Sequence, residues 1–225
     1  MSAAEDKRAG RRAGQIAHLV ISLEARMWVS LFRWILRRPV CGPGETAFAY
    51  TRRITPILGA FIGVSAIEIP ILDLILPWQT VRVIADILGA YGLIWMVGLL
   101  ATLRVNPHVV TESGLRVRGG NGLDITIPWD YLASIQANNR SLQGRETQVQ
   151  RVGDEAVLSI GVLKETNVDI AFRDPTTLEL PRGETEPLRG LRIAVDEPAA
   201  MVTLVRSIMD RGRLATRSGT PPSTI

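Results

Sequence analysis

The sequence predicts an α+β membrane protein in which a two-helix transmembrane hairpin precedes a small β-barrel capped by one helix. Two long apolar runs separated by a short joint predict the hairpin. Beyond the second run, short alternating strands with closely spaced turn residues give way to a helical period, and this predicts the barrel and its helix. The 46% hydrophobic content of the 225 residues is therefore concentrated in part of the chain.

Residues 1–15 are polar, small and basic, which predicts disorder. Residues 16–53 are predicted to form a basic amphipathic interfacial helix and a linker, with Trp28 and Phe32 opposite an arginine stripe. Glu24 falls inside the apolar arc and needs a partner there. A third span or a signal peptide are the alternatives for residues 16–38. The basic side chains expected at the membrane surface, on anionic lipid headgroups, are Arg26, Arg33, Arg37, Arg38, Arg52 and Arg53.

The two apolar runs cover residues 54–76 and 83–103. As helices each would reach about 30–35 Å, enough for a hydrocarbon core of about 30 Å. Their interior Gly and Pro residues are tolerated in transmembrane helices. The joint at residues 77–82 is short enough to require an antiparallel pair. The alternative is two buried helices in the core of a soluble protein.

Charge predicts the orientation of the hairpin. Residues 1–53 carry ten Lys and Arg, whereas the joint carries only Arg82. The positive-inside rule therefore predicts a multi-pass protein of the cytoplasmic membrane with both termini in the cytoplasm. The basic excess lies beside the membrane and residues 104–225 are balanced, so no nucleic-acid partner is expected.

Three carboxylates fall within the predicted spans: Glu68, Asp73 and Asp86. An ionisable side chain at membrane depth is a functional hypothesis by default. Asp73 and Asp86 lie near the joint, where their side chains can reach the headgroups. Glu68 lies deeper, and it suits either a hydrogen bond between subunits or an ion- or proton-coupled assembly that would require oligomerisation.

Residues 104–213 are predicted to form the cytoplasmic domain. A hairpin with its turn at residues 112–114 begins it, and a bend at Pro128 and further antiparallel strands follow. The last helix is expected after Asp196 as its cap and to stop at Gly212, with a disordered tail over residues 214–225.

The segments VTESGLRVR at 110–118 and ITIPWDYLASIQ at 125–136 resemble the opening of bacterial pleckstrin-homology-like (PH-like) domains. The wider layout over residues 40–212, with PHVV, TNVDIAF and VDEP, is similar to an uncharacterised family of actinobacterial-type membrane proteins. The resemblance implies a PH-like fold and no assigned activity. Headgroup binding by loop residues such as Arg116, Arg118 and Arg140 is a further hypothesis, beside a plain solvated surface.

The sequence contains no phosphate-binding loop, zinc-protease motif or G-x-S-x-G motif, which favours a protein that is not an enzyme and has no cofactor or metal. Cys41, the one cysteine, excludes an intrachain disulfide, and a metal or general-base role for His108 would need nearby partners that sequence does not show. The first hypothesis is a scaffold or binding protein that presents a PH-like domain to a protein or lipid partner. The alternative is a subunit of an ion- or proton-coupled assembly using the three acids.

Overall fold

The computed structural model describes residues 24–37, 41–119, 122–153, 155–180 and 183–217. The predicted disorder of residues 1–15, the start of the predicted amphipathic helix, Arg38 and residues 218–225 lie outside the described residues. The described chain is α+β and divides into two compact units. One holds the apolar helices, and the other holds the sheets and the last helix.

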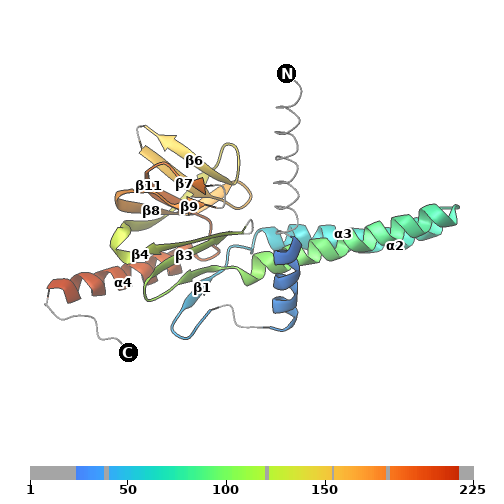
Figure 1. The fold of residues 1–225 in the computed structure, drawn as a ribbon, viewed down its shortest axis with the longest axis horizontal. Helices are drawn as coiled ribbons and strands as arrows, with labels where there is room; N and C mark the ends of the chain where they lie inside the picture. Colours follow the sequence, from blue (N-terminus) through green and yellow to red (C-terminus); the bar gives the residue numbers. More distant parts are fainter. Residues whose placement is uncertain (1–23, 38–40, 120–121, 154, 181–182, 218–225) are drawn as a thin grey trace, which may run out of the picture. The chain divides into compact units, whose positions relative to one another are not determined.

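The first unit contains the two predicted apolar helices, α2 (Ile54–Ile75) and α3 (Gln79–Val105), side by side as a hairpin (Figure 1). Both are long and apolar enough to cross a membrane. A Cβ atom on Gly89 of α3 would lie 2.8 Å from Cγ1 of Ile69, so the absence of a side chain there allows the two helices to pack closely. The connection is shorter than the predicted joint, because α3 begins at Gln79.

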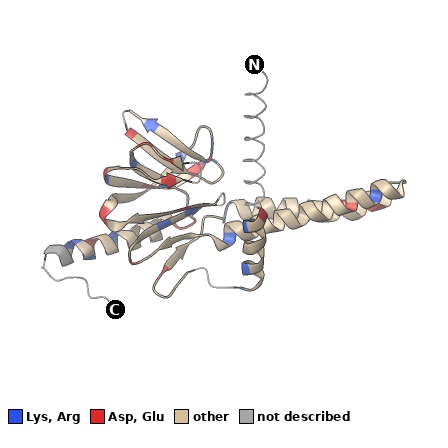
Figure 2. Cartoon of the chain, in the orientation of Figure 1, with Lys and Arg blue, Asp and Glu red and all other residues tan. Residues whose placement is uncertain are grey.

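The hairpin exposes its apolar side chains along nearly its whole length. No residue of α2 is buried, and Phe61, Ile67 and Leu74 are 62%, 62% and 88% exposed. Charged side chains are sparse on both helices (Figure 2). The alternative of two buried helices in a soluble core is therefore wrong for the described chain, since such helices would be covered by other elements.

A helix over residues 24–35 belongs to the same unit and contacts the second half of α3. Met27 is buried and would meet any side chain placed on Gly98. The Arg104 guanidinium lies 5.9 Å from the ring centre of Trp34, a cation–π distance. Val29, Phe32 and Ile35 stay exposed, so this helix keeps an apolar face of its own.

The second unit contains eleven short strands in its described part. A four-stranded sheet has the order β1 (Thr46–Phe48), β2 (His108–Val110), β3 (Gly114–Gly119) and β4 (Leu123–Pro128), all antiparallel. The β2–β3 turn is where the sequence predicts it, closed by the Thr111 amide donating to the Gly114 carbonyl at 2.9 Å. The bend at Pro128 is also confirmed, as the one-turn helix η1 (Trp129–Tyr131), whose Trp129 donates to the Glu112 carbonyl at 2.9 Å.

The second sheet has five strands. Its order is β5 (Leu132–Ser141), β8 (Glu165–Thr176), β11 (Leu188–Ile193), β7 (Glu155–Ile160) and β6 (Thr147–Val152). The chain returns after β8 through the small pair β9 (Glu179–Leu180) and β10 (Gly183–Glu184). Strand β11 then enters antiparallel to β8 and parallel to β7. The expectation of purely antiparallel pairing is wrong for this one pair, because β11 lies between two strands that run in opposite directions.

The two sheets and α4 (Pro198–Arg217) share one apolar core. Leu115 and Ile127 contribute from one sheet, Leu158 and Leu191 from the other, and Met201 from the helix, and all five are fully buried. The strand pairings do not close a barrel, since neither β4 with β5 nor β1 with β6 is paired among the described residues. The predicted capping by one helix holds, because α4 packs on β5, where Arg206 donates to the Ile135 carbonyl at 2.9 Å.

The end of α4 differs from the prediction. The helix continues through Gly212 to Arg217, so Gly212 does not stop it and residues 214–217 are helical instead of disordered. The carboxylate of Asp196 does not cap the helix. It accepts hydrogen bonds from a different segment, described below.

The main change to the predicted organisation concerns the residues before the hairpin. Residues 41–56 belong to the sheet unit, where the sequence suggested a linker up to residue 53. Strand β1 precedes α2 in the chain and pairs with β2, which follows α3, in the register Phe48↔His108. The hairpin is thus an insertion between two adjacent strands of one sheet.

Candidate functional site

The three predicted intramembrane acids do not form one cluster among the described residues. Glu68 and Asp73 are exposed, and Asp73 accepts an ion pair from Arg82 at 3.1 Å between nitrogen and oxygen. One carboxylate oxygen of Asp86 is buried and has no hydrogen-bond partner among the described residues. Asp73 on α2 therefore has a partner on α3, which the prediction of headgroup contact did not include.

The predicted surface arginines separate into two groups. Arg26 and Arg37 are exposed and Arg33 is half-buried on or just after the helix over residues 24–35. Arg52 and Arg53 belong to the sheet unit. Glu24 finds the partner that the sequence requires, because the Tyr91 hydroxyl donates to its carboxylate at 2.7 Å.

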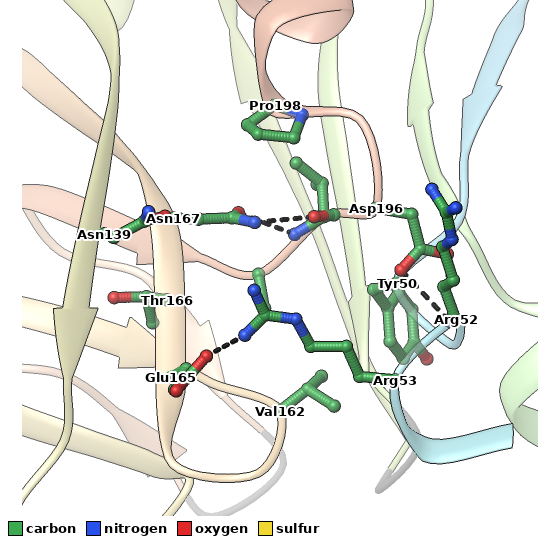
Figure 3. A pocket seen from close by; sticks show the side chains of 12 residues that line it. Tyr50, Arg52, Arg53, Asn139, Val162, Glu165, Thr166, Asn167, Asp196 and Pro198 are labelled. Carbon is green, nitrogen blue, oxygen red and sulfur yellow. Dashed lines mark hydrogen bonds and ion pairs between the residues drawn. The ribbon is translucent and has the colours of Figure 1, made fainter. Parts of the chain in front are cut away.

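A pocket of ≈ 360 Å³ opens in the sheet unit (Figure 3). Small-molecule sites typically measure about 300–1,000 Å³. Its lining comes from the segment before α2, from β5 and β8, from the connection between β7 and β8, and from the loop between β11 and α4 with the first residue of α4. Those side chains include Tyr50, Arg52, Arg53, Asn139, Glu165, Thr166, Asn167 and Asp196.

Asp196 fastens one wall of this pocket. Its carboxylate accepts the backbone N–H groups of Thr51 at 3.1 Å and Arg52 at 3.0 Å, and its own N–H donates to the Ala49 carbonyl at 2.8 Å. A carboxylate that accepts two backbone donors forms charge-assisted bonds. The loop before α4 and the segment before α2 are therefore held together across 144 residues of sequence.

Asn167 fastens the opposite wall. Its amide nitrogen donates to the Val195 carbonyl at 2.7 Å, and its amide oxygen accepts the Val195 N–H at 2.9 Å. Both ends of the amide are thus used to hold β8 against the loop before α4. Asn167 and Asp196 are structural, which leaves other side chains to contact a ligand.

An ion pair crosses the pocket between the two walls. The Arg53 side chain extends from the segment before α2 to the Glu165 carboxylate on β8 (Figure 3). These side chains are 63% and 50% exposed. Exposed ion pairs contribute only about 0–1 kcal/mol to stability, so this contact can exchange for a ligand.

A buried aromatic pair includes Tyr50, which lines the pocket. The rings of Tyr50 and His108 are 5.0 Å apart between centres, and Tyr50 is 5% exposed. Burial raises the pKa of the Tyr50 phenol, against the opposing charge of Arg118. The Tyr50 hydroxyl has no hydrogen-bond partner within the described part of the chain.

His108 is a buried core residue whose ring nitrogens both have backbone partners. Its Nδ1 accepts the Arg118 N–H at 3.2 Å, and its Nε2 lies 3.2 Å from the Ala194 carbonyl, to which it donates. Burial lowers the pKa of His108 from 6.5 to about 4. A neutral imidazole with both nitrogens bonded to the backbone has no free atom for a metal or a proton transfer.

The three arginines suggested for headgroups lie outside this pocket and are paired, and they belong to strands β3 and β5, so their prediction as loop residues is wrong. Arg116 forms two bonds of 2.6 Å with Asp124, and this contact lowers the pKa of the Asp124 carboxyl. Arg140 donates to Asp169 at 3.0 Å. Arg118 lies 3.8 Å from Asp124. Each of the three therefore has a carboxylate partner, although Arg116 and Arg118 share Asp124, and Arg140 shares Asp169 with Arg192.

The sequence indicated Arg52 and Arg53 but missed Glu165, Asn167 and Asp196. No local pattern marks these three, because their partners are 28 to 145 residues away. No cluster of three or more metal-ligating side chains occurs among the described residues. No family model, curated protein or solved structure matches the chain in the comparisons.

Proposed function

We propose that the protein is an integral protein of the cytoplasmic membrane that presents a PH-like binding domain at the inner face. Two transmembrane helices anchor it, both termini are cytoplasmic, and it acts as a scaffold without catalysing a reaction. The candidate pocket lies on the domain directly before the first span, since Arg53 precedes Ile54. This position of the pocket suits a ligand or partner at the membrane surface.

The pairing of β1 with β2 is the observation that carries this proposal. Because β1 precedes and β2 follows the hairpin, short segments connect both helices to the same sheet. The first residue of α2 and the last residue of α3 must then lie on the same side of a bilayer. The basic excess of residues 1–53 argues that this side is the cytoplasm.

The PH-like assignment is supported by two sheets packed around one core and a C-terminal helix along β5. The Trp129 bend of the resembling segment contacts the β2–β3 turn, as expected of a packing feature. The unclosed barrel and the parallel β7–β11 pair depart from the expected pattern.

The helix over residues 24–35 is proposed to lie at the interface with anionic headgroups. Its exposed apolar side chains Phe32 and Ile35 would enter the bilayer surface, while Arg26 would remain in the headgroup layer. Glu24 falls on the apolar side of this helix, and the hydrogen bond from Tyr91 gives its carboxylate a partner there.

Cysteine labelling in intact cells tests the topology. Cys41 is the one native cysteine and is half-buried in the sheet unit. A membrane-impermeant maleimide should label it only after permeabilisation, whereas Thr80→Cys in a Cys41→Ser background should be labelled in intact cells. Labelling of Cys41 from outside would contradict the proposal.

A second candidate function is favoured by the buried, unpartnered carboxylate oxygen of Asp86. Such an oxygen can hold a proton or receive a cation in an ion- or proton-coupled assembly. Replacing Asp86 with Asn, and Glu68 with Gln, should then abolish a proton flux in reconstituted vesicles. Equal fluxes in these variants and the parent protein would remove the basis for this candidate.

A further inference from the structure

The ion pair that crosses the pocket consists of two charged side chains that are free to exchange each other for a ligand. Arg53 and Glu165 are at least half exposed, whereas Asp196 and Asn167 are used in fastening the walls. A ligand that offers an anion to Arg53 and a cation to Glu165 replaces one exposed pair with two charge-assisted contacts. The pair therefore marks the two points at which a ligand binds.

The charges that line the pocket are balanced. Arg52 and Arg53 contribute two positive charges, and Glu165 and Asp196 contribute two negative charges. A simple anion would be attracted by the guanidinium groups and repelled by the carboxylates, and a simple cation would meet the reverse. A zwitterion with separated charges can satisfy both signs at once, so the balance selects for that class.

The position in the chain indicates the source of the zwitterion. Arg53 directly precedes Ile54, the first residue of the apolar helix α2. If α2 spans the bilayer, Arg53 lies at the level of the headgroups, where Arg is well suited to bind phosphate. The phosphate is the part of a phospholipid headgroup nearest the acyl chains, so it would meet Arg53 first.

We infer that this pocket binds the headgroup of a zwitterionic aminophospholipid, with the phosphate on Arg53 and the primary ammonium on Glu165. A primary ammonium has three N–H donors for the Glu165 carboxylate and for the amide oxygen of Asn139, which also lines the pocket. A choline group carries the same charge but no N–H donor. The inference rests on the proposed function, because it requires α2 to cross the membrane.

Lipid retention measured by native mass spectrometry tests the inference. The full chain is purified from nanodiscs containing equal amounts of phosphatidylethanolamine, phosphatidylcholine and phosphatidylglycerol. Phosphatidylethanolamine should be retained at least several-fold over the other two. Arg53→Gln should abolish the enrichment, and Glu165→Gln should shift it towards phosphatidylglycerol because the pocket gains one positive charge.

A matched control is available at another exposed ion pair of the same unit. A guanidinium nitrogen of Arg151 lies 2.7 Å from a carboxylate oxygen of Glu186, and neither residue lines the pocket. Arg151→Gln should retain phosphatidylethanolamine like the parent protein. Equal loss of the lipid in Arg151→Gln and Arg53→Gln would overturn the inference.

Two further arms separate the possible outcomes. If soluble O-phosphoethanolamine displaces the lipid, the headgroup chemistry is supported and a free phosphate ester is a second possible ligand. If millimolar O-phosphoethanolamine does not displace it, the result supports phosphatidylethanolamine in the membrane as the ligand. Parent protein that resists carbonate extraction but shows no lipid preference overturns the inference and leaves the anchoring intact. Parent protein that carbonate extracts from the membrane overturns the proposed function and the inference together.

Discussion

At the scale of single residues, the buried imidazole of His108 links the fold to pH. It is 2% exposed, and its two ring nitrogens form hydrogen bonds with the backbone of Arg118 and of Ala194. Burial lowers its pKa from 6.5 to about 4. The unfolded chain therefore binds a proton at a higher pH than the folded chain does.

The contribution of His108 to stability should be fully present above pH 6.5 and should decline as the pH falls towards 4. A shift of this size corresponds to roughly 3 kcal/mol. Thermal unfolding of the full chain in detergent, followed by near-ultraviolet circular dichroism, measures the decline. His108→Asn should flatten the slope between pH 6.5 and 4, and an equally steep slope in this variant would contradict the assignment.

Asp196 is the residue that sequence reasoning assigned to a different role. A cap was a sound expectation for an Asp before Pro198, because capping is a local pattern. In the structure its carboxylate instead accepts hydrogen bonds from the backbone N–H groups of Thr51 and Arg52. Nothing in the sequence near Asp196 indicates a partner 145 residues away. Glu165 and Asn167 were missed for the same reason.

Asp196→Ala should leave two backbone donors without their acceptor, at a cost of about 1–3 kcal/mol. Hydrogen exchange in nanodiscs should show faster exchange at the amides of Thr51 and Arg52, with little change in β3. Asp210→Asn, an exposed position in α4, serves as the control. Unchanged exchange at residues 51 and 52 would show that the Asp196 bonds do not hold this segment.

At the scale of elements, local patterns predicted most of what formed. The apolar length of residues 54–76 and 83–103 predicted α2 and α3 to within a few residues. The alternation in TQVQRV predicted β6 at residues 147–152. The parallel contact of β11 with β7 was not predictable, because it depends on which strand lies next to which after the chain returns.

The length of α4 gives a sharp test of one corrected element. Gly212 lies inside the helix, and a Cβ atom added there would meet no neighbouring atom within 4 Å outside the adjacent turns of the helix. Gly212→Ala should then stabilise the helix by about 0.5–1 kcal/mol and raise the thermal midpoint of the full chain. If Gly212 ended the helix in a left-handed conformation, the same change would lower the midpoint.

Gly190 in β11 provides the opposite case. A Cβ atom there would lie 2.5 Å from the Ile170 carbonyl oxygen on β8, and a backbone atom cannot move aside as a flexible side chain can. Gly190→Ala should therefore destabilise the sheet unit by at least 1 kcal/mol. Gly212→Ala is the matched control, and an equal thermal midpoint for the two variants would contradict the β8–β11 register.

At the scale of the whole molecule, the sequence predicted a hairpin and a domain as consecutive parts. The structure instead interrupts the domain, with β1 before the hairpin and β2 after it. Strand β1 has only three residues, TAF, which is too short for a period to be recognised. The proposed anchoring depends on this interruption, because it connects the sheet to the membrane at two points.

A disulfide across β1 and β2 tests the insertion most directly. In a Cys41→Ser background, Ala47→Cys and Val109→Cys place two thiols on residues paired in register. A protease site introduced into the connection between α2 and α3 allows the chain to be cut after mild oxidation of isolated membranes. If the hairpin is inserted in the sheet, the two fragments should stay joined on a non-reducing gel and separate when reduced, whereas fragments that separate without reduction would contradict the insertion.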